Sequence, residues 1–402
     1  MRTRQVATVA VLAAMGLWVA SFGGRTTDAA GSPAPAAPVE VATVDDAGTA
    51  DGATAVRLTP PRRTFTVAAV GDFLAEGLVN NAAAAAAPPG VRYDYEPLLR
   101  PHAFLVKFAD LAICHMETPI GPPGAKVGFV GKGVYGTNLI AAAWETPFDL
   151  QRVGFDRCST ASNHANDTGA DGIRTTLEAL DAAGLSHNGT ARTPEEAAVS
   201  TFMVNGVRVT HLSYARNSNT GFPREEWRLS RAVTADKVLA DVAQARALGA
   251  EVVIISLHVY VEMQTGPTAE DRALVNTITR AAAKPDLVLI HGPHVPQNVE
   301  RVNGITTYWS LGNYISGMGV SGRGKYSDPR TLDGLMALVR FTQQPNGSWL
   351  VEPWTALLCN ALGSRIVYPG ITTLATPGIS STLRSQMQAC LTRTSAVVSL
   401  LK

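Results

Sequence analysis

Short polar motifs follow several apolar runs of this chain, and they constrain its fold more than any other feature. The motifs are Gly71-Asp72, His115-Met116-Glu117, Ser162-Asn163-His164, His258, and His291-Gly292-Pro293-His294 followed by Gln297. In an α/β protein, the ends of neighbouring strands can bring such groups together. Carboxylate, amide and imidazole groups gathered in this way form a ligand set for borderline divalent metals. The sequence therefore predicts a metal site.

Predicted strands and helices alternate along the chain. Strands are expected within residues 65–70, 105–113, 155–161, 201–204, 207–214, 252–258, 287–290 and 306–310. A helical stripe within 171–183 stops at Gly184, and segments 233–248 and 269–283 also have helical character. This alternation favours a layered α/β fold with its active groups on loops at strand ends.

The first residues have the layout of an export signal. Arg2 and Arg4 precede an apolar run from residue 6 to about residue 20, and small residues follow it. The run is also about long enough to span a bilayer, so an uncleaved anchor is the alternative. We therefore expect residues 1–24 to be a signal peptide or an N-terminal membrane anchor. In either case the body would lie outside the cell or in the cell envelope.

The remaining chain divides into three parts by composition. Residues 25–64 are rich in Ala, Pro, Thr and Gly and contain too few large apolar side chains to offset the entropy of ordering, so they predict a disordered linker. Residues 65–360 form the predicted domain, and 361–402 a C-terminal extension packed on it. A hydrophobic content of 46% supports a substantial core. The net charge of +1, without a basic stripe, argues against a nucleic-acid partner.

Four cysteines allow two disulfides in an exported protein. Cys359 with Cys390 is the preferred pair, because this bond would pin the C-terminal segment to the body. Cys114 and Cys158 each end an apolar run before a polar motif, so they are expected either to be neighbours in space or to be small buried hydrophobic residues.

Each candidate ligand also has a structural interpretation when taken alone. Asp72 resembles a turn or cap residue, and Glu117 could form a buried salt bridge. The strongest local signal is the pair His291 and His294, whose loop is fixed by Gly and Pro. Apart from His115, four of the eight histidines fall in the strand-end motifs, and that joint placement favours a site. His115 is expected to support the ligands, and the other three histidines to be structural.

A glycine-rich segment imitates a phosphate-binding loop. Residues 319–325 read G-x-x-x-x-G-K, but Tyr326 stands where Ser or Thr would bind magnesium, and no helical pattern follows. We interpret it as a glycine-rich loop. Arg323 and Lys325 would offer anion contacts if the loop borders the site, and a plain surface loop is the alternative.

The order of the motifs resembles the CapA family of bacterial capsule and poly-γ-glutamate synthesis proteins. The matching segments, which lie between about residues 65 and 316, are Ala69-Val70-Gly71-Asp72, Met116-Glu117-Thr118-Pro119, Ser162 to Gly169, His258, His291 to Gln297, and Ser310-Leu311-Gly312-Asn313-Tyr314. That family is similar to calcineurin-like metallophosphoesterases. The resemblance implies a four-layer αββα sandwich of the metallophosphoesterase type.

The resemblance also implies residue roles. Asp72 would hold one of two divalent ions (Mn, Fe or Zn), Glu117 would bridge both, Asn163 and His258 would hold the second, and His291 and His294 would complete the site. His164 would be the general acid. Expected supporting or substrate residues are His115, Asp167, Glu262, Gln297 and Asn313. Two departures concern His115, where the family usually has Asn, and residues 259–261, where it has Trp-Gly before the Glu.

Three functions follow from these expectations. The first is a metal-dependent phosphoesterase acting on an anionic envelope polymer or a phosphorylated precursor, within a possible membrane synthesis complex. The second is a non-catalytic component that binds metal and anionic polymer. The third is a purely structural envelope protein, which would purify without metal.

Overall fold

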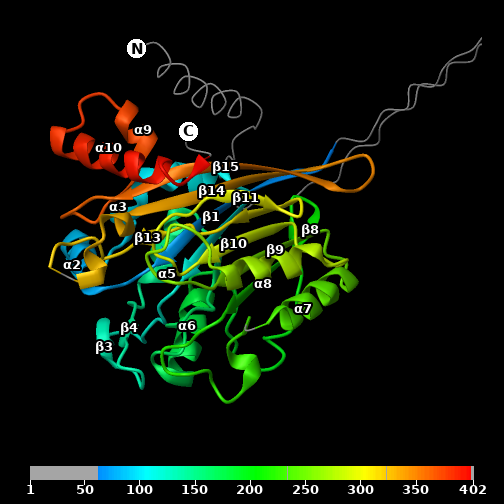
Figure 1. Ribbon diagram of the computed structural model, residues 1–402. Coiled ribbons are helices and arrows are strands. Elements are labelled where there is room, and N and C mark those ends of the chain that lie inside the picture. The colour runs from blue at the N-terminus through cyan, green and yellow to red at the C-terminus, as the bar shows by residue number, and fades with distance from the viewer. Residues whose placement is uncertain (1–61, 233, 323, 400–402) are drawn as a thin grey trace, which may run out of the picture. The chain divides into compact units, whose positions relative to one another are not determined.

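The computed structural model describes residues 62–232, 234–322 and 324–399 (Figure 1). The predicted signal peptide or anchor, Arg323 and nearly all of the predicted linker lie outside these residues. Thr64, the last residue of that linker, opens the first strand. Within the described chain, no helix is both long and apolar enough to cross a membrane.

Two sheets form the centre of the domain. The first has eight strands in the order β16-β15-β14-β1-β2-β5-β6, with β13 beside β1. Its strands are β1 (Thr64–Phe73), β2 (Leu111–Met116), β5 (Arg157–Ser159), β6 (Ser186–Asn188), β13 (Asn313–Ile315), β14 (Asp333–Gln343), β15 (Trp349–Asn360) and β16 (Val367–Pro369). Because β1, β2, β5 and β6 are parallel, their carboxyl ends share one edge of the sheet.

The second sheet has six strands in the order β11-β12-β10-β9-β8-β7. Its strands are β7 (Phe202–Val204), β8 (Val207–Ala215), β9 (Val252–His258), β10 (Leu287–His291), β11 (Val299–Val302) and β12 (Ile305–Tyr308). Strands β8, β9, β10 and β12 are parallel. A separate hairpin joins β3 (Gly128–Lys132) to β4 (Asn138–Ala141).

Helices cover the outer faces of both sheets. Those packed on the first sheet are α2 (Gly77–Ala86), α3 (Glu96–Leu99), α4 (Ala103–Phe108), α5 (Thr146–Val153) and α6 (Gly169–Ala182). The second sheet is covered by α7 (Ala235–Ala247) and α8 (Ala269–Arg280), as Figure 1 shows. Short 3-10 turns are η1 (Arg100–His102), η2 (Glu226–Arg228), η3 (Gly324–Ser327) and η4 (Pro329–Leu332). The predicted four-layer αββα sandwich is confirmed.

Alternate side chains of strand β1 face the two cores on either side of the first sheet. Val67 and Ala69 point into the core between the two sheets, whereas Ala68 and Val70 point into the core under the helices. Successive side chains of a strand face opposite sides, so a strand buried on both faces must be apolar throughout. This explains why the strands appear in the sequence as continuous apolar runs.

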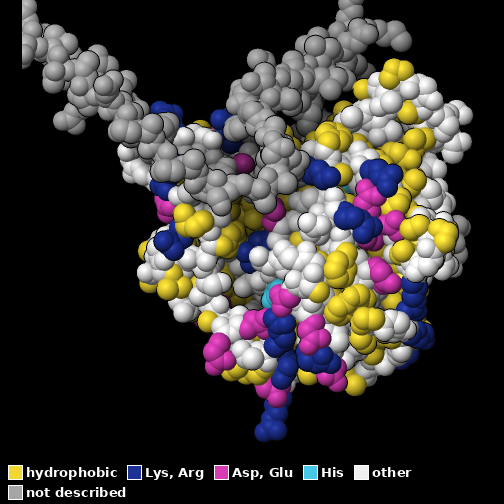
Figure 2. Space-filling view, turned by 180° about the vertical axis from the view of Figure 1, so that it is seen from behind, with side chains coloured by type: hydrophobic (Ala, Val, Ile, Leu, Met, Phe, Trp, Pro, Cys, Tyr) yellow, Lys and Arg dark blue, Asp and Glu magenta, His cyan; other side chains and the backbone are white. Residues whose placement is uncertain are grey.

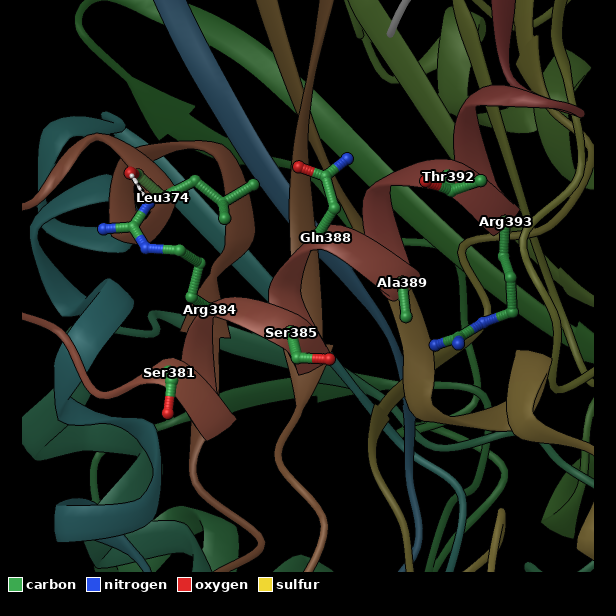
Figure 3. Close-up of a pocket in the computed structure, with 8 residues that line it drawn as sticks. All are labelled: Leu374, Ser381, Arg384, Ser385, Gln388, Ala389, Thr392 and Arg393. Atoms are coloured by element: carbon green, nitrogen blue, oxygen red, sulfur yellow. Dashed lines mark hydrogen bonds between the residues drawn. The ribbon is translucent and has the colours of Figure 1, made fainter.

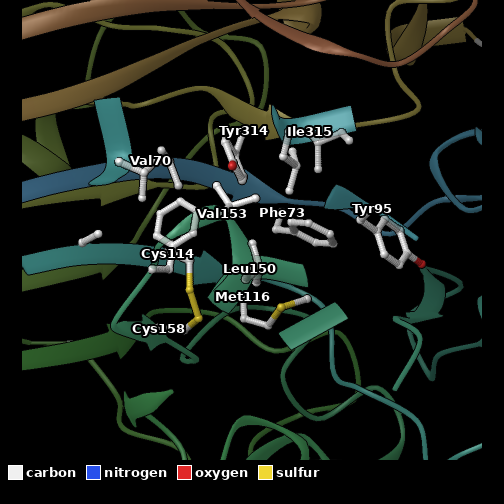
Figure 4. Close-up of a cluster of buried hydrophobic side chains, with 14 of the residues drawn as sticks. Val70, Phe73, Tyr95, Cys114, Met116, Leu150, Val153, Cys158, Tyr314 and Ile315 are labelled. Carbon is white, nitrogen blue, oxygen red and sulfur yellow. A yellow bond between two sulfur atoms is a disulfide. The ribbon is translucent and has the colours of Figure 1, made fainter. Parts of the chain in front are cut away.

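A disulfide ties together β2, the neighbour of β1, and β5, the next strand in the sheet. Cys114 of β2 and Cys158 of β5 are register partners and are bonded. Figure 4 shows this disulfide within the helix-side core, near Val70 and Leu150. Of the two expectations for this pair, adjacency in space is the one found.

The C-terminal segment continues the first sheet and then forms two helices. Strand β16 pairs with β15, and α9 (Gly370–Ala375) and α10 (Ser381–Ser395) follow. The predicted Cys359–Cys390 disulfide joins β15 to α10, and Arg393 forms an ion pair with the buried Asp333 at 2.6 Å. A shallow hollow runs along α10, where the Arg384 guanidinium donates to the Leu374 carbonyl at 3.1 Å (Figure 3).

One predicted strand was placed too early. Residues 105–108 belong to helix α4, and strand β2 runs over Leu111–Met116. Leu105 and Val106 are buried in the helix-side core, so they are apolar for the same reason as strand residues. A short apolar run cannot by itself distinguish a buried strand from a buried helix.

The surface mixes charges of both signs. On the face in Figure 2, Lys and Arg side chains lie beside Asp and Glu side chains. This pattern matches the nearly balanced total of 34 basic and 33 acidic residues.

Candidate metal centre

Asp72 lies at the carboxyl end of β1, between two neighbouring strands. It pairs with His115 of β2 on one side and with Asn313 of β13 on the other. The preceding Gly71 approaches Gly312 so closely that a Cβ would lie 1.9 Å from the Gly312 carbonyl oxygen. The Asp72 amide donates to that oxygen at 3.0 Å. Glycine at position 71 therefore permits the backbone contact that fixes the carboxylate.

The second sheet brings imidazoles to the same place. His258 ends β9 and pairs in register with His291, which ends β10. Gly292 has a φ of +102°, and a Cβ there would lie 2.3 Å from the Tyr260 ring. Its amide donates to Asp72 Oδ2 at 3.1 Å. Since Asp72 belongs to the first sheet, this bond links the two sheets at the site.

Three histidines surround the Asp72 carboxylate. Its Oδ2 lies 3.0 Å from His294 Nδ1. Its Oδ1 lies 3.6 Å from His291 Nδ1 and 3.9 Å from His115 Nε2. All four side chains are buried, and His294 adopts a positive φ of 60°, which is uncommon for a residue with a Cβ.

Glu117 faces the same cluster from the end of β2. Its Oε1 lies 3.9 Å from both His258 Nε2 and His294 Nε2. Two groups of potential ligand atoms result, Asp72 with Glu117 and His294, and Asp72 with His115 and His258, with the atoms of each group within 4.8 Å of one another. Asp72 belongs to both groups.

Several buried polar atoms at this site lack a hydrogen-bond partner among the described residues. They are Glu117 Oε1 and Oε2, His258 Nε2, and both ring nitrogens of His291; Asn163 Oδ1, in the loop after β5, is also buried and unpaired. A buried polar atom left unpaired costs about 1 to 3 kcal/mol, and more if it is charged. The unpaired atoms are oxygens and imidazole nitrogens, which suit Mn, Fe or Zn. The residues therefore fit divalent metals.

Burial and neighbouring charges shift the pKa values in this cluster. Burial raises the pKa of Glu117 well above its usual value and lowers that of His258 to about 3. Burial alone would raise the pKa of Asp72, but the neighbouring imidazoles of His291 and His294 hold it well below its usual value. Burial would lower the pKa of His294, but Glu117 and Asp72 raise it to about 10. The pKa values of His258 and His294 thus shift in opposite directions, because the neighbouring acids outweigh the effect of burial only at His294.

His164 stands beside the cluster with an accessible ring. Its Nδ1 lies 2.6 Å from Asp167 Oδ2, and its side chain is 13% exposed. The Asp167 carboxylate also accepts the Ile140 amide at 2.8 Å, so its position is fixed. The preceding Ser162 hydroxyl donates to the Glu117 carbonyl at 2.5 Å, which joins this loop to the end of β2.

The remaining predicted site residues occupy different positions around the cluster. Asn313 Oδ1 lies 3.0 Å from His294 Nδ1, within the cluster. Gln297 is buried, and its amide donates to the Gln264 carbonyl at 2.9 Å. Glu262 lies farther out and pairs with the exposed Lys325 at 2.5 Å.

The glycine-rich loop is held over Glu262 by that ion pair. Residues 324–327 form the 3-10 turn η3, followed by η4, so no α-helix follows the G-x-x-x-x-G-K segment here. The Gly319 amide donates to the Tyr326 carbonyl at 2.8 Å, which closes the loop on itself. The rejection of a phosphate-binding loop agrees with this conformation.

Two residues at the site were not singled out from the sequence. The Tyr260 ring centroid lies 5.1 Å from that of His258, and Asn219 Nδ2 lies 3.1 Å from His164 Nδ1. The position of Tyr260, two residues after a strand-end histidine, was a usable signal. Asn219 carried no such signal because it lies in a long loop after β8.

The fold and the site together define a class of protein: an αββα sandwich with a buried carboxylate, imidazole and amide cluster where its two sheets meet. A family model described as "Bacterial capsule synthesis protein PGA_cap" matches residues 66–318, well over half of the chain. The chain belongs to this family.

Relatives with curated names agree with the family. The chain is 27% identical over 218 residues to "Capsule biosynthesis protein CapA" of Bacillus anthracis, covering 53% of this chain and 50% of the relative. It is 26% identical over 205 residues to "PGA biosynthesis protein CapA" of Bacillus subtilis (strain 168), covering 50% and 51%. The chain thus spans about half the length of these relatives.

Solved structures with a similar fold include two at low sequence identity. One is the calcineurin-like phosphoesterase YfkN from Bacillus subtilis, at 12% identity and a TM-score of 0.43, covering 83% of this chain and 98% of that chain. The other is a 5'-nucleotidase precursor from Thermus thermophilus, at 12% identity and a TM-score of 0.40, covering 83% and 59%. These likenesses concern the fold.

Proposed function

We propose that this protein is an exported, metal-dependent phosphoesterase of capsule or poly-γ-glutamate-type polymer biosynthesis. Its substrate would be an anionic envelope polymer or a phosphorylated precursor. The observation that carries this proposal is the set of buried, unpaired ligand atoms on Glu117, His258 and His291 around Asp72. A bound cation would satisfy these atoms and offset the cost of burying them.

The proposal assigns two metal ions to this ligand set. Asp72 and Glu117 both face His294, His291 lies beside Asp72 at the end of β10, and His258 faces Glu117 from the end of β9. Asn163 would add an amide oxygen to the ion held by His258. When bound, two divalent ions can activate a water molecule and stabilise the charge on both the attacking and leaving oxygens.

His164 would protonate the leaving oxygen of the ester. Asp167 Oδ2 lies 2.6 Å from Nδ1 and would accept its hydrogen, which leaves Nε2, with the Asn219 amide 3.4 Å away, as the nitrogen for the substrate. The partial exposure of the ring gives a substrate access, unlike the buried histidines around Asp72. Proton transfer of this kind contributes about 10²- to 10⁴-fold to a rate.

Export is supported by the cysteines. All four form disulfides, Cys114 with Cys158 and Cys359 with Cys390. Structural disulfides persist mainly in oxidising compartments outside the cytoplasm. The relatives named for capsule and PGA biosynthesis support an envelope polymer as the setting.

Metal analysis with a turnover assay tests the proposal. Purified protein should contain a divalent metal and release phosphate from an aryl phosphate in the presence of Mn²⁺, Fe²⁺ or Zn²⁺. His164→Gln should retain the metal while losing about 10²-fold or more in kcat. Protein that binds none of these ions would overturn the proposal. Metal binding without any turnover would instead favour the non-catalytic, polymer-binding function.

A further inference from the structure

A chain of hydrogen-bonding contacts leads from strand β5 to a candidate metal ligand. Ser159 Oγ lies 3.4 Å from the Cys114 carbonyl and 2.7 Å from His115 Nδ1. His115 Nε2 lies 3.0 Å from His258 Nδ1. The other ring nitrogen of His258, Nε2, faces Glu117 Oε1 at 3.9 Å and has no hydrogen-bond partner among the residues described.

The donors and acceptors in this chain determine its direction. A carbonyl can only accept, so the Ser159 hydroxyl donates its hydrogen to Cys114. The Ser159 oxygen then accepts from His115 Nδ1–H, as its second contact requires. A neutral imidazole has one N–H and one lone pair, so each ring can donate at one nitrogen and accept at the other.

The direction of hydrogen bonding at His115 then sets the direction at His258. Since His115 Nδ1 carries the hydrogen, its Nε2 holds the lone pair and accepts from His258 Nδ1–H. His258 Nε2 is therefore left with a lone pair directed toward the carboxylate cluster. A metal ligand needs this unprotonated nitrogen.

The backbone holds the chain rigidly. His115 and Ser159 are register partners on β2 and β5, and the Cys114–Cys158 disulfide joins the residues immediately before them. On the other side, the His115 ring stacks on His291 with centroids 3.9 Å apart and an angle of 16°. The His115 ring is thus fixed in position and in rotation.

We propose that His115 is a positioning residue that fixes the tautomer of His258, so that His258 presents the Nε2 lone pair to the metal. This inference rests on the proposed metal site and deepens it. It also gives a role to His115, which stands where the family usually has Asn. The His115 imidazole can accept a hydrogen bond from His258 at Nε2 while it donates one to Ser159 at Nδ1. One side chain therefore connects Ser159 to His258.

Nitrogen NMR of the metal-free protein tests the tautomer directly. In uniformly ¹⁵N-labelled protein, long-range correlations should show His258 protonated at Nδ1. In His115→Leu the acceptor is lost, and His258 should shift to a mixture of tautomers. His115→Gln places an amide oxygen near the former Nε2, so it should restore the Nδ1–H form. Protonation of His258 at Nε2 in the wild-type protein would overturn the inference.

Metal affinity gives a second readout, measured by equilibrium dialysis with Mn²⁺ or Zn²⁺. His115→Leu should weaken binding about 10- to 100-fold, as is usual when the partner of a ligating histidine is removed. His115→Gln should recover most of this loss. The matched control is His102→Gln, which changes another buried histidine and should bind metal as the wild type does.

The outcomes separate this inference from the proposed function. If wild-type protein binds neither ion, the metal site itself is wrong, whereas the NMR result for His258 still stands. If the wild type binds and His115→Leu binds equally well, the positioning role is wrong. If His115→Gln loses as much affinity as His115→Leu, while His258 keeps its Nδ1–H form in both, His115 ligates the metal directly and the inference is overturned.

Discussion

Two buried histidine environments in this protein differ in how their polar atoms are satisfied. His102 has a partner at each ring nitrogen, the Val367 carbonyl at 3.1 Å from Nδ1 and the Tyr314 hydroxyl at 2.7 Å from Nε2. His291, equally buried at the carboxyl end of β10, has no hydrogen-bond partner at either nitrogen within the described chain. The protein itself supplies a partner for both ring nitrogens of His102, but for neither ring nitrogen of His291 among the described residues.

The difference shows that burial alone does not identify a functional histidine. Both rings are shielded from water, but His102 contributes to the fold through two satisfied contacts. His291 gains no such bond, so its burial costs free energy unless a ligand completes it. Unpaired buried atoms are therefore the better indication of the metal site.

The largest expected effect separates the two environments by metal binding. Asp72→Asn should reduce metal affinity by more than the roughly 100-fold seen when only a ligand's partner is removed. His102→Gln should leave metal content unchanged. Elemental analysis of both purified variants measures this contrast, and equal metal loss in both would break the comparison.

Acid should destabilise the His102 environment. Burial lowers the pKa of His102 to about 4, so between about pH 6.5 and 4 the unfolded chain binds a proton that the folded protein does not. Stability is therefore lost as the pH falls through this range, by about 3 kcal/mol. Urea unfolding at several pH values should show a shallower pH dependence for His102→Gln than for the wild type. Identical slopes would contradict the assignment.

Metal-free stability should respond differently to substitutions at the two environments. His102→Gln breaks satisfied contacts and should cost roughly 1 to 3 kcal/mol. Glu117→Gln removes a buried acid whose two oxygens lack partners, so it should leave the chelated protein as stable or make it more stable. Thermal unfolding with EDTA compares the two variants. A large loss for Glu117→Gln would mean that its oxygens are satisfied without metal.

The smallest effect is expected at the ion pair between Glu262 and Lys325, which lies outside the cluster. Lys325 is largely exposed, and its pair with Glu262 should contribute less than about 1 kcal/mol. Lys325→Ala should therefore change the melting temperature little and leave metal affinity unchanged. A marked loss of bound metal would place the Lys325 loop inside the metal centre.

Sequence reasoning located individual elements well where patterns were long. Strand β9 runs over Val252–His258, and α8 begins at Ala269, both as predicted. The strand expected within 105–113 was misplaced because Leu105 and Val106 are buried on a helix. A short run of apolar residues indicates that these residues are buried. It does not indicate whether a helix or a strand buries them.

The candidate site was also only partly accessible from sequence. Asp72, Glu117, His258, His291 and His294 were all expected near a common centre, and the structure brings them together. His115 was expected to support the ligands, but its contact with His258 Nδ1 could not be derived. That contact joins residues 143 positions apart in the chain.

The sequence by itself determined the chemistry available to this protein: which strands end in carboxylates, imidazoles or amides, and which glycines permit close backbone approach. Only the tertiary structure decided which of these atoms remain unpaired. Register between β1 and β2, and the contact between the two sheets, bring Asp72 to His115, His291 and His294. The physical reason is that pairing of polar atoms depends on distances of a few ångströms between distant segments, which only the packed sheets define.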